Sequence, residues 1–203
     1  MVLDTLSWLE HYIEWAGAIL SLAYLFFSIK QNILLWPLGI ISSALYVVVY
    51  LNTKLFALCG LQVYYVFISI YGWWFWKRGK TKGSKDKGDI PITHGSPSQT
   101  VVLTLITLSL FVLFAFILKR FMNSDMPYAD SFITSLSIVA TWMLARKIID
   151  QWLVWIVADG ISIVLYVYKG MYPTVALFIA YTVMAVIGYI SWKKELQKQL
   201  LSA

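Results

Sequence analysis

One apolar segment near the C-terminal end carries the residues best suited to chemistry. Asp159 lies near the middle of the apolar run 152–168. Trp155 precedes it by four residues, and Ser162 and Tyr166 follow it by three and seven, so a helix places all four side chains on one face. An indole beside a carboxylate suits an aromatic cation, because the indole stacks on the ring while the acid takes its charge or its hydroxyl groups.

Two explanations account for a carboxylate inside an apolar segment. Inserting such a group into a bilayer costs at least about 2.5 kcal/mol, so it needs a partner or a watery cavity. Asp159 could be protonated and make a hydrogen bond that packs two helices. It could instead face a cationic or hydroxyl-rich solute, and its polar and aromatic neighbours favour this second explanation.

Three other apolar runs carry polar or aromatic stripes at helical spacing, among them an amide, Gln62, that could bind a carboxamide or a hydroxyl. For any one aromatic residue, packing or interface anchoring is the simpler explanation, and a single Ser or Thr usually bonds within the membrane helices. The evidence is therefore the convergence of the stripes. The predicted substrate-binding residues are Trp36, Tyr46, Gln62, Tyr65, Trp73, Ser131, Trp155, Asp159, Ser162 and Tyr166.

Other chemistry has little support in the sequence. No Gly-rich loop followed by Lys-Ser/Thr suggests ATP hydrolysis. The single cysteine, Cys59, excludes an internal disulfide, and His11 and His94 have no partners at metal-ligand spacing. The last apolar run has no lysine before Lys193, so a retinal Schiff base is excluded. We therefore predict no catalytic residues, no cofactor and no metal.

The elements that position these residues are long apolar runs. The chain is 60% hydrophobic and 13% charged, whereas soluble domains carry about 25% charged residues. Runs long enough to cross a core of about 30 Å must become helices, because lipid offers the backbone no hydrogen-bond partners. The sequence predicts an all-α membrane protein with seven transmembrane helices, the fifth extending to Ile149. They span residues 13–29, 34–50, 56–76, 100–118, 131–145, 152–168 and 173–192.

The distribution of basic residues predicts the orientation. With the N-terminus outside, twelve of the sixteen Lys and Arg residues fall on the cytoplasmic side, so the C-terminus is cytoplasmic. Because the basic residues lie in short loops, the net charge of +6 indicates topology rather than nucleic-acid binding. The chain up to the start of the first span contains Asp4 and Glu10, with Glu14 just inside the span, but no Lys or Arg, which does not fit a signal peptide.

The two halves of the chain resemble each other. Gly72 and Gly188 are each followed by three residues, a Trp and two basic residues. We therefore group the seven predicted helices as three helices, one linker helix and three further helices, which form a parallel 3+1+3 repeat. The low-complexity stretch between the halves predicts a flexible cytoplasmic linker. The predicted parts are the N-terminal segment 1–12, the first three-helix bundle 13–76, the cytoplasmic linker 77–98, the linker helix and outer loop 99–129, the second three-helix bundle 130–192 and the cytoplasmic tail 193–203.

Several motifs, in order, resemble the PnuC family of vitamin transporters. They are Leu61-Gln62-Val63, Ile70-Tyr71-Gly72-Trp73, Ser135 to Ala140 with Arg146-Lys147, and Trp155 to Gly170. The resemblance implies a SWEET-like fold, a solute site at mid-membrane between the two bundles, and facilitated diffusion by alternating access across the bacterial inner membrane. Cytosolic phosphorylation would then trap the product. The family's Trp-x-x-x-Asn/Asp pattern falls on Trp155 and Asp159.

The resemblance also limits the choice of solute. Family members carry nicotinamide riboside, and close relatives carry thiamine or riboflavin. Nicotinamide riboside and thiamine both contain a cationic aromatic ring, so Asp159 does not separate them. The turn 171–174 is closer to thiamine-type relatives, which keeps that alternative open. The expected partners are a small vitamin and the lipid bilayer, with homo-oligomerisation left open. A membrane-embedded enzyme or binding protein that uses Asp159, and a purely structural membrane protein, are the remaining classes.

Overall fold

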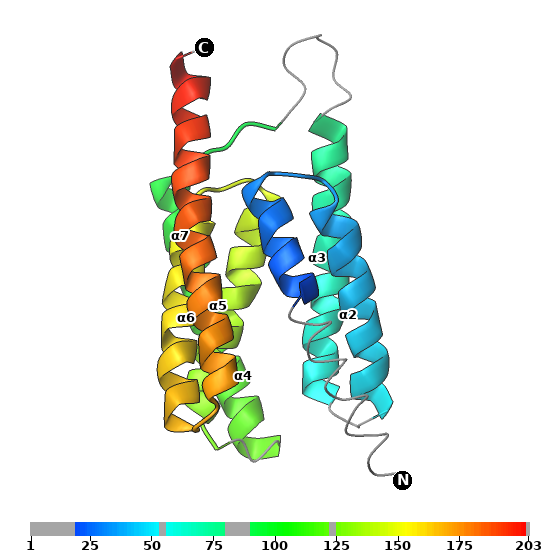
Figure 1. Cartoon of the computed structure of the whole chain (residues 1–203). Coiled ribbons are helices and arrows are strands. Elements are labelled where there is room, and N and C mark those ends of the chain that lie inside the picture. Colours follow the sequence, from blue (N-terminus) through cyan, green and yellow to red (C-terminus); the bar gives the residue numbers. More distant parts are fainter. Residues whose placement is uncertain (1–18, 53–55, 80–89, 122–124, 202–203) are drawn as a thin grey trace. The chain divides into compact units, whose positions relative to one another are not determined.

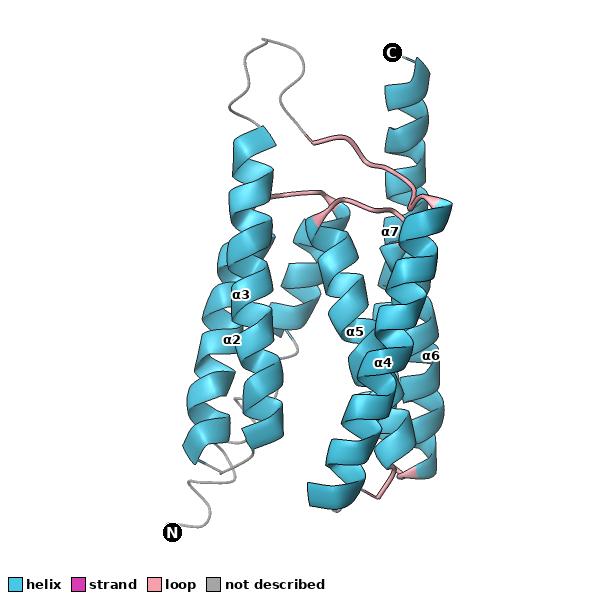
Figure 2. Cartoon of the chain, turned by 180° about the vertical axis from the view of Figure 1, so that it is seen from behind, coloured by secondary structure: helices cyan, strands magenta, loops and turns pink. Residues whose placement is uncertain are grey.

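The computed structural model describes residues 19–52, 56–79, 90–121 and 125–201. These residues form seven helices and no β-strand (Figures 1 and 2), as the apolar runs predict. The helices are Ile19–Ile29, α2 (Leu35–Asn52), α3 (Phe56–Gly79), α4 (Pro97–Phe121), α5 (Pro127–Ala145), α6 (Gln151–Tyr168) and α7 (Tyr172–Leu201). Each predicted span overlaps one of them, although residues 13–18 of the first span lie outside the described residues.

Four segments are long and apolar enough to cross a membrane, namely Leu58–Gly79, Pro97–Phe121, Gln151–Tyr168 and Tyr172–Leu201. The chain is therefore a multi-pass membrane protein. Ile19–Ile29 and Leu35–Val48 are apolar but shorter. α5 is not among the four, because serines and threonines are interspersed among its apolar residues.

The fifth span, predicted at residues 131–145, is found as α5, which begins four residues earlier at Pro127, with Met126 in the N-cap position, and ends at Ala145 as the span predicts. The predicted extension to Ile149 fails, because α5 ends at Ala145 and Lys147 has a φ of 54°. A left-handed residue breaks the helical hydrogen-bond ladder, so the chain turns before the next helix begins.

α4 begins three residues before its predicted start. Ser96 precedes Pro97, the first helical residue, and its Oγ accepts a hydrogen bond from the Gln99 backbone N–H at 3.3 Å. The Gln99 Oε1 accepts one from the Ser96 N–H at 3.1 Å. This reciprocal pair is a capping box, and Pro is favoured at the first helical position because its missing N–H would be unpaired there.

The chain divides into two compact units, residues 1–70 and 71–203. In the first unit α2 approaches α3 closely at Gly39, where an added Cβ would lie 2.9 Å from the Ser69 Oγ. In the second unit α4, α5, α6 and α7 run side by side, each packed on the next (Figures 1 and 2). There, an edge-to-face pair of Trp152 and Trp192, with ring centroids 5.7 Å apart, packs beside Gly188.

The end of α3 packs on the end of α5 within the second unit. The Trp76 Nε1 donates to the Ala145 carbonyl oxygen at 3.0 Å, and the Lys147 Nζ lies 4.6 Å from the centroid of the Trp76 ring. The Arg146 Nη1 donates to the Tyr71 hydroxyl at 3.0 Å. Lys147 is 3% exposed, so its side chain is buried at the turn that ends the fifth span. The chain reverses there and turns its side chain onto the indole.

Part of the predicted flexible linker is held by specific contacts. Thr93 and Ile148 form an isolated parallel bridge. The Ile92 N–H donates to the Gln199 Oε1 at 3.1 Å, and Ile92 itself is buried. Flexibility is therefore the wrong description for residues 90–96, which bind the turn before α6 and the end of α7. Residues 80–89 lie outside the described residues.

Candidate functional site

The structure contains the predicted face of α6, which is formed by Trp155, Asp159, Ser162 and Tyr166. Asp159 and Ser162 are 5% and 1% exposed, and Trp155 and Tyr166 are half-buried beside them. The opposite face is open, with Val157 50% exposed. Spacing of three and four residues keeps the four side chains on one side, because the helix repeats every 3.6 residues. The sequence therefore identified a buried helix face that carries a carboxylate.

Asp159 has no hydrogen-bond or ion-pair partner among the described residues. Burying a carboxylate without a partner is costly, so the position is kept at the expense of stability. The packing explanation requires a partner in a neighbouring helix, and none is found in the part of the chain that the structure describes. A cationic group of a solute would supply the missing interaction.

The serines of the predicted site already donate within their own helices. The Ser162 Oγ donates to the Ala158 carbonyl oxygen at 2.8 Å, and the Ser131 Oγ donates to the Pro127 carbonyl oxygen. Their protons are used, but their oxygen lone pairs stay available as acceptors. Ser162 therefore provides a small, weakly polar surface one turn from Asp159, and the hydroxyl protons of both serines are already used.

Tyr166 lies at the C-terminal end of the α6 face. Its ring stacks on Phe178 of α7, with centroids 5.3 Å apart and planes inclined by 20°.

Trp73 does not join the α6 face through any contact described. It is 41% exposed, and the Lys77 Nζ lies 6.0 Å from its ring centroid. This pairing along one helix is typical of an aromatic residue at an interface. Its role in binding stays a prediction.

Four predicted residues belong to the first unit. Trp36 is fully buried, whereas Tyr46, Gln62 and Tyr65 are partly buried. Tyr24, which the sequence reasoning did not single out, packs beside α2, since a Cβ added at Gly39 would lie 3.3 Å from its Cε2 atom. The predicted convergence of these residues with the α6 face, which belongs to the other unit, stays a prediction.

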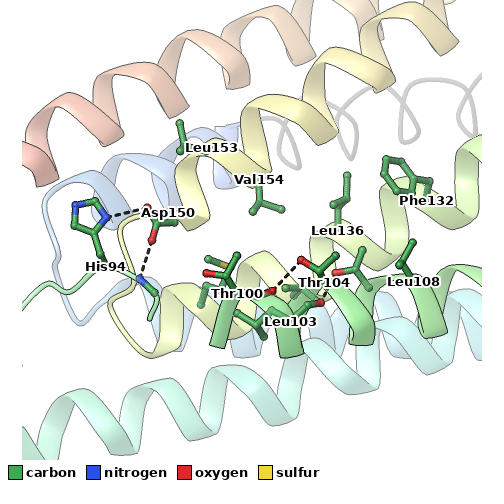
Figure 3. A pocket seen from close by; sticks show the side chains of 14 residues that line it. His94, Thr100, Leu103, Thr104, Leu108, Phe132, Leu136, Asp150, Leu153 and Val154 are labelled. Carbon is green, nitrogen blue, oxygen red and sulfur yellow. Dashed lines mark hydrogen bonds and ion pairs between the residues drawn. The ribbon is translucent and has the colours of Figure 1, made fainter. Parts of the chain in front are cut away.

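A cavity of about 670 Å³ lies in the second unit, between α4, α5 and α6. None of the ten predicted residues lines it. Its walls are mainly aliphatic, with His94 and Asp150 at one end and Phe132 at the other (Figure 3). Such walls do not suit a cationic, hydroxyl-rich solute. In the described parts of the chain, no group of three or more His, Cys, Asp or Glu side chains could hold a metal ion.

Known proteins resemble the chain over almost its full length. It is 26% identical to the nicotinamide riboside transporter PnuC of Escherichia coli (strain K12), over 92% of this chain and 85% of that protein. It is 22% identical to the riboflavin/roseoflavin transporter RibM of Streptomyces davaonensis, over 90% of this chain and 86% of that protein.

The fold is that of a solved structure. The crystal structure of the vitamin B3 transporter PnuC matches with a TM-score of 0.68 at 23% identity, covering 89% of this chain and 80% of that one. The model of the nicotinamide mononucleotide transporter family matches residues 11–194. With a buried carboxylate facing inward on α6 and this match over nearly the whole sequence, the chain belongs to the nicotinamide mononucleotide transporter family, the PnuC family.

Proposed function

We propose that the protein takes up nicotinamide riboside across the bacterial inner membrane by facilitated diffusion. The observation that carries this proposal is the buried Asp159 carboxylate, which has no partner among the described residues and lies one helical turn from Trp155. A nicotinamide ring joined to ribose is a flat cation with hydroxyl groups. Trp155 would stack on the ring, and Asp159 would bind its positive charge or the ribose hydroxyls.

The proposed mechanism is alternating access in a parallel 3+1+3, SWEET-like architecture. Two bundles would rock around one central site, with α4 as the linker helix. The related motifs around Gly72 and Gly188 support the repeat, and both glycines are buried. The N-terminus would lie outside and the C-terminus in the cytoplasm. No coupling ion is part of the proposal, so the gradient of the solute drives transport.

Two other vitamins are candidates. RibM, which is named a riboflavin/roseoflavin transporter, is 22% identical to this chain, so riboflavin is a second candidate. Thiamine is the third, because it also carries a cationic aromatic ring that Asp159 would bind. A membrane-embedded enzyme is disfavoured, since the relatives described above are transporters.

Calorimetry on the purified full chain tests the proposal. We expect micromolar or tighter binding of nicotinamide riboside, and about tenfold or more weaker binding after Trp155→Ala or Asp159→Ala, because each removes an interaction worth on the order of 1–3 kcal/mol. Val157→Ala is the matched control, since Val157 lies two residues from Asp159 on the exposed face. This variant should bind as the unaltered protein does.

The same protein in liposomes separates a transporter from a receptor. Saturable counterflow of labelled nicotinamide riboside is expected of a transporter, whereas a receptor or enzyme binds without flux. Binding of riboflavin or thiamine in preference to nicotinamide riboside would overturn the choice of solute. Equal binding by the Asp159→Ala and Val157→Ala variants would overturn the choice of site.

A further inference from the structure

The turns that precede α2 and α6 have the same backbone geometry. Gln31 and Lys147 have φ values of 52° and 54°, and no other non-glycine residue in the described parts of the chain has a positive φ. The six hydrogen bonds of the first turn all recur in the second, with each residue number higher by 116. The Gln31 N–H, for example, donates to the Ser28 carbonyl oxygen at 3.1 Å, and the Lys147 N–H donates to the Leu144 carbonyl oxygen at 3.0 Å.

The same offset relates the ends of the two halves of the chain. Gly72 and Gly188, which begin the matching sequence motifs, are also 116 residues apart. The offset pairs Trp36 with Trp152, and both of these side chains are buried. Because the turns and the distant motifs give one offset, the two halves can be compared position by position without a gap.

At the position of Trp155 the first half has a glycine. Trp155 corresponds to Gly39 of α2. A Cβ added at Gly39 would lie 2.9 Å from the Ser69 Oγ and 3.3 Å from the Tyr24 Cε2. The Tyr24 ring therefore packs directly against α2, where a larger residue than glycine would displace a neighbour.

The second half distributes large and small residues in the opposite way. Ala140 of α5 corresponds to Tyr24. Ala185 of α7 corresponds to Ser69, and both alanines are buried. Two small residues leave room for a large side chain on α6, and α6 supplies Trp155. Each half therefore combines one large aromatic ring with two small residues, so Tyr24 is the counterpart of Trp155 in volume.

The hydroxyl of Tyr24 indicates a role beyond filling space. Tyr24 is half-buried in an apolar helix, and its hydroxyl has no hydrogen-bond partner among the described residues. A buried tyrosine hydroxyl usually finds a partner, and a phenylalanine would fill the same space without this cost. A solute with hydroxyl or amide groups would supply the missing hydrogen bond.

The first half carries no charge at the position that corresponds to Asp159. That position is Ser43, which is 7% exposed. The charge of a cationic solute would therefore be bound by the second half alone. Ring stacking and a neutral hydrogen bond are the contacts that the first half can add.

We propose that Tyr24 contacts the solute, with its ring against the aromatic ring of the solute and its hydroxyl bonded to a solute amide or hydroxyl group. The proposal rests on the proposed function, because it assumes that Trp155 stacks on the same solute. Each half of the chain would then supply one aromatic ring, and the second half would also supply the charge.

Calorimetry of nicotinamide riboside binding to the purified full chain tests this contact. Tyr24→Leu should weaken binding by about tenfold or more, because it removes both the ring and the hydroxyl. Tyr24→Phe should weaken binding by about fivefold, the factor that corresponds to a hydrogen bond of about 1 kcal/mol. Phe26→Leu is the matched control, since Phe26 is 52% exposed on the same helix, and its affinity should stay unchanged.

Thermal unfolding separates this contact from a purely structural role. Tyr24→Phe should melt at the same temperature or higher, because an unpartnered hydroxyl is removed. This variant also carries the binding test if Tyr24→Leu folds poorly.

An exchange of side chains tests the correspondence with Trp155. Gly39→Trp alone should lower the melting temperature, because the indole would meet Tyr24 and Ser69. Combining it with Tyr24→Ala and Ser69→Ala reproduces the residues of the second half and should restore most of the loss. Absence of any recovery would contradict the correspondence.

The outcomes distinguish this proposal from the proposed function. Equal affinities of the Tyr24→Leu and Phe26→Leu variants would overturn the contact. If Trp155→Ala and Asp159→Ala still weaken binding in that case, the proposed function stands without Tyr24. Unchanged affinity and a lower melting temperature in Tyr24→Phe would assign the hydroxyl to packing. Failure of the unaltered protein to bind nicotinamide riboside would overturn the proposed function, and this proposal with it.

Discussion

Asp159 and Gly188 are both buried, but they have opposite effects on the stability of the fold. Asp159 places a charge where no partner is found among the described residues, which costs stability. Gly188 does the reverse, since it lets the Trp152 ring pack directly on the backbone of α7. We propose that solute binding explains the first residue, whereas packing explains the second. Substitutions at the two sites should therefore change different measured quantities.

Asp159→Asn should separate binding from stability. The amide keeps the size of the side chain but removes the charge, so we expect affinity for nicotinamide riboside to fall by about tenfold or more. The melting temperature of the solute-free protein should stay the same or rise, because burying a neutral amide costs less than burying a carboxylate. Calorimetry and thermal unfolding in detergent measure the two effects. A lower melting temperature with unchanged affinity would favour the packing explanation.

Gly188→Ala should destabilise the second unit. The added Cβ would lie 2.6 Å from the Trp152 Cη2, and overpacking of this kind costs about 1–3 kcal/mol. Gly160→Ala is the control, because a Cβ there meets nothing within 4 Å. Alanine favours helix over glycine by up to about 1 kcal/mol, so this variant should be neutral or stabilising. Equal melting temperatures of the two variants would contradict the packing argument.

At the scale of elements, helix ends depend on local chemistry as well as apolar length. Apolar periodicity places α4 correctly but cannot show that Ser96 and Gln99 start it at Pro97. The Ser-x-x-Gln signal was present in the sequence and could have been recognised. After Ala145 the sequence offers no Pro or Gly and returns to apolar residues at Ile148 and Ile149, yet the helix stops at Ala145. The contacts of Arg146 and Lys147 with α3 accompany that turn, and no local signal predicts them.

Ser96→Ala should loosen the start of α4. It removes a cap worth about 1 kcal/mol, so amide hydrogen exchange across residues 98–101 should quicken by about fivefold, the factor corresponding to 1 kcal/mol. Ser109→Ala should leave exchange at these positions unchanged, because the Ser109 hydroxyl bonds a carbonyl inside the helix. Unchanged exchange after Ser96→Ala would show that other contacts, such as the Thr93–Ile148 bridge, hold this end.

At the scale of the whole molecule, the proposed orientation in the membrane rests on the distribution of basic residues. α7 has 30 residues, so it is about 45 Å long at 1.5 Å per residue. Its last turns therefore extend past a hydrocarbon core of about 30 Å. This extension carries Lys193, Lys194 and Lys198. Lys169, in contrast, lies at the C-terminal end of α6, just before α7 begins. The positive-inside rule therefore predicts that the basic extension lies in the cytoplasm.

Cysteine labelling in intact cells tests this orientation. In a Cys59→Ser background, Lys198→Cys should react only with a membrane-permeant maleimide, because the C-terminal extension is expected inside. Lys169→Cys should react with an impermeant maleimide added from outside. The two positions are exposed in the structure, so accessibility does not limit either reaction. The opposite pattern would reverse the proposed topology.

The sequence by itself determined the all-helical membrane fold, the approximate helix positions, the family and the α6 face with Asp159. These follow from apolar runs, helical spacing and motifs, which depend on residues close together in the chain. Tertiary structure alone decided the turn at Lys147, the stacking of Tyr166 on Phe178, the lack of a partner for Asp159 among the described residues, and the cavity between α4, α5 and α6. Each depends on residues that meet only when separate helices pack, and helical spacing contains no information about which helices become neighbours.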